Sequence, residues 1–195
     1  MFNHVATRVR SIDPALRNIF VVALFVHVAL FGLIYSRLGE KGFVDIVDDG
    51  QTYQQIAVNL LAGNGYSMTG EAPYLPDAIR VPIVPVLMAA SLALSGSILP
   101  FVLFSIVIGL LQMPLVYLIA RELQLSRRYI LWSVAIIGLE PSTLMITDLA
   151  LSEALFTSTL LLAILLMMRA TQRTFTYRSA VGLGLSLGVL SLVRP

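Results

Sequence analysis

Two adjacent carboxylates, Asp48 and Asp49, are the residues of this sequence best suited to acid–base chemistry. The chain has only 11 acidic residues among 195, and four of them lie between positions 40 and 49, directly after the first long apolar run. These four are Glu40, Asp45, Asp48 and Asp49. A carboxylate without a cationic partner beside an apolar region is a candidate proton acceptor. Asp48 and Asp49 are therefore candidates for a general base.

Helix capping is the ordinary alternative for this pair. An Asp at an N-cap accepts a hydrogen bond from the first free amides of a helix, and Asp48 followed by Gln51 has the spacing of a capping box. One Asp suffices as a cap, so the other stays available as a base. The sequence leaves open which of Asp48 and Asp49 has which role.

The residues that follow predict an amphipathic helix from Gly50 to Leu61. Its apolar residues recur at helical spacing: Tyr53, Ile56, Ala57, Leu60 and Leu61. Its other face is expected to be polar: Gln51, Thr52, Gln54, Gln55 and Asn59. The glycines of Gly63-Asn64-Gly65 are expected to stop the helix.

Arg80 and Glu153 are two further candidates. A guanidinium presents fixed, paired donors to phosphate oxygens and keeps its charge, so Arg80 is a candidate phosphate ligand, with an interfacial anchor as its alternative role. Glu153 lies near the start of an apolar segment, where an acid is a functional candidate. Its alternative is a helix cap shared with Ser152 or Asp148.

The composition predicts an integral membrane protein, because 57% of the residues are hydrophobic and 12% are charged, with a mean hydropathy of +0.87.

The absence of cysteine excludes disulfides and thiolate metal sites. His4 and His27 lie far apart, and His27, within an apolar run, is expected to make a hydrogen bond inside a helix bundle. Mg²⁺ or Mn²⁺ is a candidate cofactor, but no spacing of the acids predicts a metal site. The dispersed basic residues do not indicate nucleic-acid binding.

The apolar segments predict a single all-α membrane domain over residues 1–195, with about five transmembrane helices. It divides into a cytoplasmic N-terminus, a first span, an extracytoplasmic loop with juxtamembrane helices, and four further spans, at residues 1–18, 19–36, 37–97 and 98–195. The four spans follow apolar runs at residues 98–120, 129–147, 149–168 and 179–193. Glu140 is expected to satisfy backbone groups released by a kink at Pro141.

The basic residues predict the orientation, since cytoplasmic loops are rich in Lys and Arg. The N-terminus and residues 121–128 and 169–178 contain nine of the 13 basic residues but only two acids. These regions share one face only if the apolar segment Val81 to Leu94 does not cross the membrane, so we expect it to lie in or dip into the outer leaflet. This topology brings one set of charged residues to the extracytoplasmic face of the plasma membrane: Asp48, Asp49, Arg80, Asp148 and Glu153.

Five short motifs follow one another after the first span. They are Asp49–Ala57, Asn59–Ser67, Arg80–Pro85, Leu151–Phe156 and Leu192–Pro195. In this order they resemble the membrane glycosyltransferases of the GT-C superfold that use polyprenyl-phosphate sugar donors. Within that superfold they resemble the protein mannosyltransferase and aminoarabinose-transferase-like group, family 39 and its relatives. The resemblance covers nearly all of the chain and roughly the N-terminal half of the family fold.

The resemblance implies an inverting glycosyltransferase that acts on the extracytoplasmic face. It implies a polyprenyl-phosphate-linked sugar donor, membrane lipids around the site, and a lipid, glycan or protein acceptor. By the same resemblance Asp49 is the catalytic base and Arg80 contacts the lipid phosphate. Tyr53, Glu153 and Arg194 are implied to contact the substrates.

The chain departs from the family pattern at Gly50, where many relatives have Glu, and at Val84, where an aromatic residue is common. Asp48 is a candidate replacement for the carboxylate missing at position 50, so the choice of base between Asp48 and Asp49 stays open. Members of the family are several hundred residues long, and we therefore expect this chain to be truncated at its C-terminus or to be a reduced version.

A non-catalytic membrane scaffold or lipid-binding subunit is the alternative function. Such a module would dock a partner or an anionic lipid through the outer acidic loop and Arg80. A small transporter has less support, because the charged residues gather at one face and not near the middle of the membrane.

Overall fold

The computed structural model describes residues 13–172 and 176–194, and every regular element in these ranges is an α-helix. The helices are α1 (Pro14–Leu38), α2 (Gly42–Asp45), α3 (Asp48–Leu61), α4 (Ile83–Ser95), α5 (Leu99–Leu110), α6 (Gln112–Glu122), α7 (Arg127–Leu139), α8 (Pro141–Asp148), α9 (Glu153–Gln172) and α10 (Tyr177–Val193). The all-α membrane fold expected from the sequence is confirmed. Residues 1–12, most of the predicted cytoplasmic N-terminus, lie outside the described residues.

Three helical units of the described chain are long and apolar enough to cross a membrane: α1, the 24-residue unit of α5 and α6, and α9. The bent pair of α7 and α8 is a fourth if it forms one span. The last predicted span, at 179–193, corresponds to α10, a shorter apolar helix of 17 residues. By length and composition the protein is therefore an integral membrane protein, and its described residues contain three or four such spans, where about five were expected from the sequence.

The first helix extends beyond the predicted span at both ends. Asp13 caps it, because its carboxylate accepts a hydrogen bond from the Ala15 N–H at 2.9 Å, and Pro14 takes the first helical position. Gly39, with φ of +65°, ends it. The capping residues at its two ends thus set the length of α1. The apolar run alone does not predict this length.

Proline explains the irregular points of the other spans. Glu140 caps α8 by accepting hydrogen bonds from the N–H groups of Ser142 and Thr143 at 3.0 and 2.6 Å, and the chain bends by 46° there. The predicted role of Glu140 at the proline kink is confirmed. The break between α5 and α6 lies just before Pro114, whose missing N–H leaves one carbonyl of the preceding turn without its helical partner.

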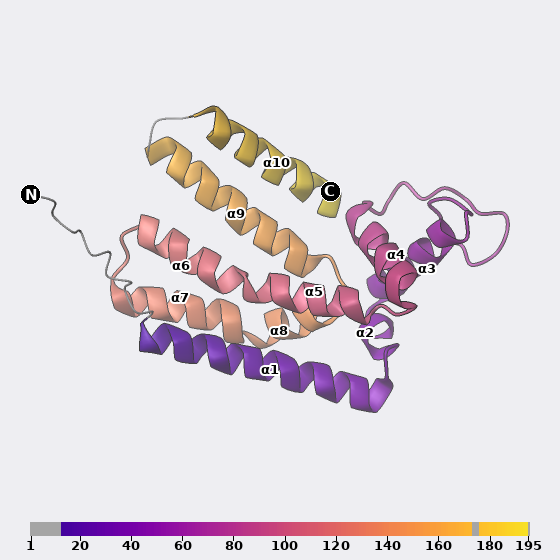
Figure 1. Ribbon diagram of the computed structural model, residues 1–195, viewed down its shortest axis with the longest axis horizontal. Helices are drawn as coiled ribbons and strands as arrows, with labels where there is room; N and C mark the ends of the chain where they lie inside the picture. The colour runs from indigo at the N-terminus through magenta and orange to yellow at the C-terminus, as the bar shows by residue number, and fades with distance from the viewer. Residues whose placement is uncertain (1–12, 173–175, 195) are drawn as a thin grey trace, which may run out of the picture.

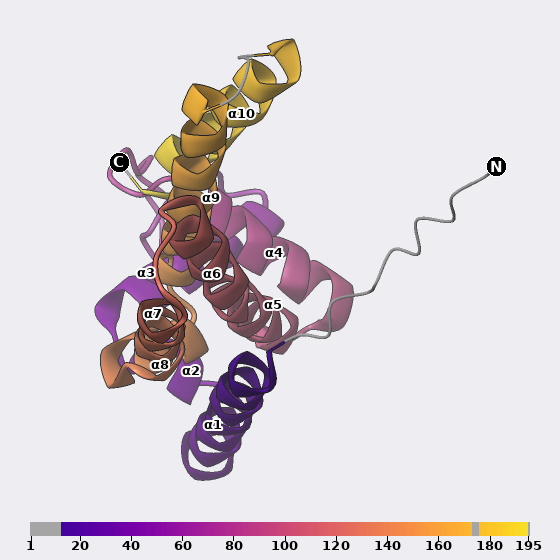
Figure 2. The same ribbon diagram turned by 90° about the vertical axis from the view of Figure 1, so that its left-hand side faces the viewer.

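The long helices stack side by side in the order α10, α9, α5–α6, α7–α8 and α1 (Figures 1 and 2). Helices α2, α3 and α4 form a small lobe at one end of this stack, close to the start of α9 and the end of α10 (Figure 1). Helix α4 packs against α3 within this lobe and does not run along the stack. The predicted segment from Val81 to Leu94 thus forms a helix that stays at one end.

Ion pairs join helices at the opposite end of the stack. The Arg127 guanidinium donates to the Asp13 carboxylate, with Nε to Oδ2 at 2.7 Å and Nη2 to Oδ1 at 3.0 Å. This pairing holds the pKa of Asp13 below its ordinary value. Arg169 makes a similar pair with Glu122, with Nε to Oε1 at 2.7 Å. Both described acids of this basic end are therefore matched to an arginine from another helix.

The small lobe is joined to the stack by apolar packing, by one hydrogen bond between main-chain groups and by one hydrogen bond from a main-chain N–H to a carboxylate. Phe43, Val44 and Val84 are almost completely buried in one core that continues into α5. The Ala150 N–H donates to the Phe43 carbonyl at 2.9 Å. The Ile98 N–H donates to the Glu40 carboxylate at 2.5 Å. These contacts set the position of α3 relative to the membrane helices.

His27 and Asp148 form a buried pair between α1 and α8, with 2.5 Å between His27 Nδ1 and Asp148 Oδ1. The prediction that His27 makes a hydrogen bond within the bundle is confirmed. The expectation that Asp148 joins the charged outer face is wrong, because its side chain is completely buried. A buried carboxylate needs a partner inside the protein, and α1 supplies the histidine.

Candidate functional site

Asp49 and Arg80 form an ion pair in the small lobe. Arg80 Nη2 lies 2.7 Å from Asp49 Oδ1, and both side chains are partly exposed. Asp49 lies in the first turn of α3, and Arg80 precedes α4. The fold therefore brings together two candidates that are 31 positions apart in the sequence, at the end of the stack where the lobe lies.

Tyr53 completes this group. It follows Asp49 by one helical turn, and the Arg80 guanidinium carbon lies 5.6 Å from the centre of its ring. Only 4% of Tyr53 is exposed, so the ring is a fixed support and the cation is held over its face. We call these three residues the Asp49–Tyr53–Arg80 cluster. It joins a carboxylate, an aromatic ring and a guanidinium at one partly open surface.

The capping-box prediction for Asp48 is wrong. Helix α3 starts at Asp48 itself, and its N-cap is Val47, which makes no side-chain capping bond. Asp48 and Asp49 instead occupy the first turn, where the helix dipole favours negative charge. The Asp48 side chain is exposed and makes no ion pair or hydrogen bond within residues 13–172 and 176–194.

Close packing explains the glycine at position 50. A Cβ atom added there would lie 2.7 Å from the Val44 carbonyl oxygen and 3.2 Å from the Val44 Cα. The backbone of α2 thus occupies the space that a side chain would need. With α2 in this position, the glutamate of many relatives does not fit at residue 50.

Asn59 anchors the loop that carries Arg80. Its side-chain amide donates to the Ser67 carbonyl at 2.7 Å and to the Thr69 carbonyl at 2.8 Å. The residue lies on the predicted polar face of α3 but is only 2% exposed, because the loop covers this face here. The amide is buried because loop carbonyls satisfy both of its N–H groups. Helical periodicity could not reveal this, since the partners lie outside the helix.

Tyr66 and Asp77 hold the main chain of Arg80. The Tyr66 hydroxyl donates to the carbonyls of Arg80 and Val81 at 3.1 and 3.0 Å, and the Asp77 carboxylate accepts from the Arg80 N–H at 3.3 Å. Burial, with smaller contributions from Asp77 and Tyr53, raises the pKa of Tyr66 to about 12. The sequence did not single out Asp77, and it included Tyr66 only within a family motif.

Glu153 and Arg194 form a second charged group. Arg194 Nη1 lies 3.6 Å from Glu153 Oε1, and its guanidinium carbon lies 6.0 Å from the centre of the Phe156 ring. Glu153 begins α9 and Arg194 directly follows α10. Both helix ends point toward the small lobe (Figure 1). Among the described residues, no ion pair links this group to the Asp49–Tyr53–Arg80 cluster.

Metal-ligating residues do not gather in the described part of the chain. No group of three or more His, Cys, Asp or Glu residues is arranged there to hold a metal ion.

The comparison with known families gives the same family that the short motifs resemble. A family model described as dolichyl-phosphate-mannose-protein mannosyltransferase matches residues 88–193, more than half of the 195-residue chain. The chain belongs to this family. The protein is thus a membrane glycosyltransferase in general, and the family implies a dolichyl-phosphate sugar donor and a protein acceptor in general. No curated protein and no solved structure gives a match.

The family match divides the candidate residues into two sets. Glu153 lies inside the matched segment, whereas Asp49, Tyr53 and Arg80 precede it. The case for the Asp49–Tyr53–Arg80 cluster therefore depends on its own geometry and on the short motifs, and it is independent of the family match.

Proposed function

We propose that the protein is an inverting glycosyltransferase that takes a sugar from a polyprenyl-phosphate donor at the extracytoplasmic face of the plasma membrane, with Asp49 as the general base. The observation that carries this proposal is the pair of Asp49 and Arg80 at 2.7 Å. It sets a proton acceptor beside a phosphate ligand, which are the two groups that such a transfer needs.

Arg80 binds the lipid phosphate in this proposal. Its guanidinium has five N–H groups in one plane, so it can hold a phosphate oxygen while one nitrogen stays on Asp49. The Tyr53 ring lies against the face of the guanidinium, and the Tyr66 hydroxyl donates a hydrogen bond to the main-chain carbonyl of Arg80. The anomeric carbon, joined to the phosphate through one oxygen, is thereby brought near Asp49.

Asp49 removes the proton of the acceptor hydroxyl. Its Oδ2 makes no hydrogen bond within the described ranges, so this oxygen is available as the acceptor. As the proton moves to Asp49, the acceptor oxygen forms a bond to the anomeric carbon. The bond from that carbon to the phosphate oxygen breaks, and its electron pair leaves with the polyprenyl phosphate. Attack from the side opposite the phosphate inverts the anomeric centre.

The proposed sidedness follows from the two ends of the stack. The basic end contains the ion pairs of Asp13 with Arg127 and of Glu122 with Arg169, and Lys and Arg mark the cytoplasmic side. The small lobe lies at the other end (Figure 1). Glu153 and Arg194, also at that end, are proposed to contact the substrates.

A transfer assay with the full chain in lipid vesicles tests the proposal. The donor is a polyprenyl-phosphate-linked hexose, and product formation is followed for Asp49→Asn, Asp48→Asn and the double variant. Because loss of a general base lowers rates by about 10²–10⁴-fold, Asp49→Asn is expected to lose activity by that factor and Asp48→Asn to keep it. Asp45→Asn, an exposed acid of α2, is the matched control.

Arg80 is tested in the same assay. Arg80→Gln is expected to raise the KM for the lipid-linked donor, and Arg80→Lys is expected to restore part of the affinity because it keeps the charge but loses the paired donors.

Undiminished turnover in the double variant of Asp48 and Asp49 would rule out the proposed base.

A further inference from the structure

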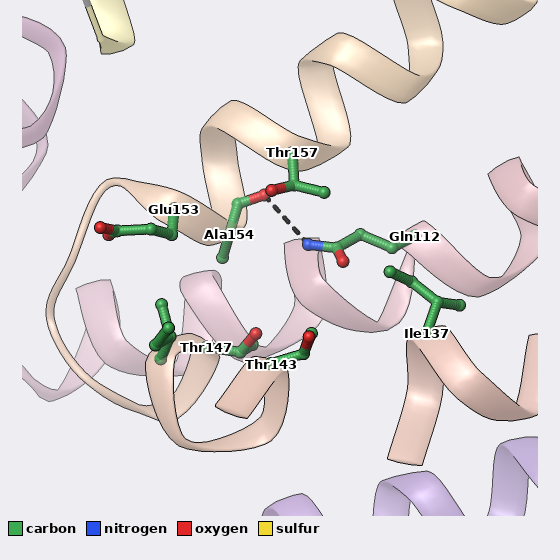
Figure 3. A pocket seen from close by; sticks show the side chains of 8 residues that line it. Gln112, Ile137, Thr143, Thr147, Glu153, Ala154 and Thr157 are labelled. Atoms are coloured by element: carbon green, nitrogen blue, oxygen red, sulfur yellow. Dashed lines mark hydrogen bonds between the residues drawn. The ribbon is translucent and has the colours of Figure 1, made fainter. Parts of the chain in front are cut away.

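The segment between α8 and α9 determines where Glu153 lies. It consists of residues 149–152, each of which is at most 5% exposed. Glu153 follows directly as the first residue of α9, and its side chain is 29% exposed. Figure 3 shows Thr147 and Glu153 on the two sides of this connection, where both line a cavity of about 160 Å³. A buried segment thus carries an accessible carboxylate.

Two contacts hold this segment, and both come from the first part of the chain. At its start, His27 of α1 pairs with Asp148, the last residue of α8, with 2.5 Å between Nδ1 and Oδ1. Two residues later, the Ala150 N–H donates to the Phe43 carbonyl of α2 at 2.9 Å. The main chain between α8 and α9 is therefore held at two points shortly before Glu153.

Asp148 occupies an unfavourable place for a carboxyl group. Its side chain is completely buried, and its Oδ2 has no hydrogen-bond partner within the described ranges. It also lies at the C-terminal end of α8, where the helix dipole disfavours negative charge. Replacing a buried ion pair with apolar residues of similar volume is often neutral or stabilising. The stability of the fold therefore gives no reason for this pair, whereas the placement of the segment does.

Hydrogen bonds carry this placement into α9. The Ser152 carbonyl accepts from the Phe156 N–H at 2.9 Å in the first turn of the helix, and the Ser152 hydroxyl donates to Glu153 Oε2 at 3.4 Å. Glu153 Oε1 in turn lies 3.6 Å from Nη1 of Arg194, which follows α10. A shift of residues 149–152 would therefore move Glu153 relative to Arg194.

We propose that His27 and Asp148 are positioning residues of the transfer reaction, because their pair fixes residues 149–152 and thereby holds Glu153 beside Arg194. This inference rests on the proposed function, in which Glu153 contacts the substrates. Both positioning residues are buried and act only through the segment. A misplacement of about 1 Å can lower a rate about 10²-fold, so a pair that touches no substrate can still control the rate.

Two substitutions of similar shape at position 27 separate the hydrogen bond from the packing. In His27→Asn the side-chain amide can replace Nδ1 as a donor to Asp148, whereas His27→Leu fills the space without a donor. In the transfer assay kcat is expected to fall about 10- to 100-fold in His27→Leu and to recover to near the wild-type value in His27→Asn. The KM for the lipid-linked donor is expected to stay unchanged, because Arg80, the proposed phosphate ligand, lies in the small lobe.

A double variant separates positioning from stability. With His27→Leu and Asp148→Leu combined, no buried carboxyl group is left unpaired, so the thermal unfolding midpoint in detergent is expected to be at or above that of the wild type. The kcat is nevertheless expected to stay about 10-fold or more below the wild-type value. Wild-type kcat in this variant would show that the pair only stabilises the fold, and it would overturn the proposal. The double variant decides alone if His27→Leu does not fold.

Ser158→Ala is the matched control. It removes another buried hydrogen bond of the bundle, from the Ser158 hydroxyl to the Ile108 carbonyl at 2.8 Å, which does not involve residues 149–152. This variant is expected to lower the unfolding midpoint and to leave kcat unchanged. An equal loss of kcat in Ser158→Ala and in the double leucine variant would contradict a specific role for the pair.

Cross-linking measures the placement of Glu153 without turnover. Because the chain has no cysteine, Glu153→Cys and Arg194→Cys together introduce one pair of thiols. A short bifunctional maleimide is expected to cross-link them when His27 and Asp148 are present, and most of this cross-linking is expected to be lost in the double leucine background. Equal cross-linking in both backgrounds would overturn the proposal. If cross-linking is lost but the wild type transfers no sugar, the proposed function fails while the positioning of Glu153 by the pair stands.

Discussion

At the scale of single residues, Arg80 is positioned through its main chain as much as through its charge. Tyr66 and Asp77 hold its carbonyl and its N–H, while Asp49 and Tyr53 contact the guanidinium. The guanidinium is consequently held on one side by fixed groups and stays partly open on the other. This arrangement suits a residue that must exchange one partner for another during a reaction.

Tyr66→Phe tests the support of Arg80. The loss of one hydroxyl and its two hydrogen bonds is expected to raise the KM for the lipid-linked donor about 3- to 10-fold, because a hydrogen bond contributes about 0.5–1.5 kcal/mol. Tyr177→Phe, at an exposed residue of α10, is the control. An unchanged KM in Tyr66→Phe would show that Arg80 does not depend on this contact.

The ionisation of Tyr66 gives a pH prediction. Its pKa is raised to about 12 because partial burial of the phenol favours the neutral form, against about 10 in the unfolded chain. The stabilisation is therefore complete below pH ~10 and is lost as the pH rises through about 12. The tyrosinate absorbance of wild type minus Tyr66→Phe is expected to titrate near pH 12. A difference that titrates near pH 10 would contradict the burial of this phenol.

Sequence reasoning predicted the three members of the Asp49–Tyr53–Arg80 cluster but not the residues that support them. Asp49, Tyr53 and Arg80 were predicted because their types suit phosphate-linked transfer and follow a family order. Asn59 was assigned to the polar face of its helix, but its burial was not predicted, since periodicity cannot foresee loop carbonyls that bury an amide. Asp148 was grouped with the outer charges, because its histidine partner lies 121 positions away.

At the scale of helices, α2 determines where α3 can lie. The four-residue helix presses its backbone against Gly50, and its Phe43 carbonyl receives a hydrogen bond from Ala150. The apolar runs predicted the long helices, but they did not predict α2 or the loop at 149–152. Both depend on tertiary contacts, which a local apolar pattern does not contain.

Gly50→Ala tests the contact between α2 and α3. Alanine in place of glycine within a helix ordinarily stabilises by about 0.5–1 kcal/mol, but here the added Cβ would meet the Val44 carbonyl. We expect a loss of about 1–3 kcal/mol, as in overpacked cores, together with lower transfer activity. Gly184→Ala in α10, where nothing lies within 4 Å of the added atom, is the control and should be neutral or stabilising. Thermal unfolding in detergent gives both values, and equal midpoint shifts in the two variants would contradict the packing.

At the scale of the whole molecule, the two ends of the helix stack differ in the charged groups that they carry. One end is joined by arginine–carboxylate pairs between helices, and the other carries the lobe with the candidate cluster. The bias of basic residues predicted which loops lie together, and the path of the chain agrees with that prediction (Figure 1).

Cysteine labelling tests the sidedness of these ends. The chain has no cysteine, so Ser126→Cys and Asn64→Cys each introduce a single thiol. In intact cells a membrane-impermeant reagent is expected to label position 64 and to reach position 126 only after permeabilisation. Labelling of position 126 from outside would reverse the proposed orientation, whereas labelling of both sites after permeabilisation confirms that each thiol is reactive.

The hydrogen bond from Ala150 to Phe43 has an evolutionary consequence. It joins the segment before the family match to the segment within it, and both of its partners are main-chain groups. The bond itself does not depend on which side chains stand at 43 and 150, except that proline at 150 would lack the N–H; packing in the core restricts both positions separately. Substitutions at the exposed positions of the lobe that carries the proposed base should therefore leave this attachment to the membrane helices intact.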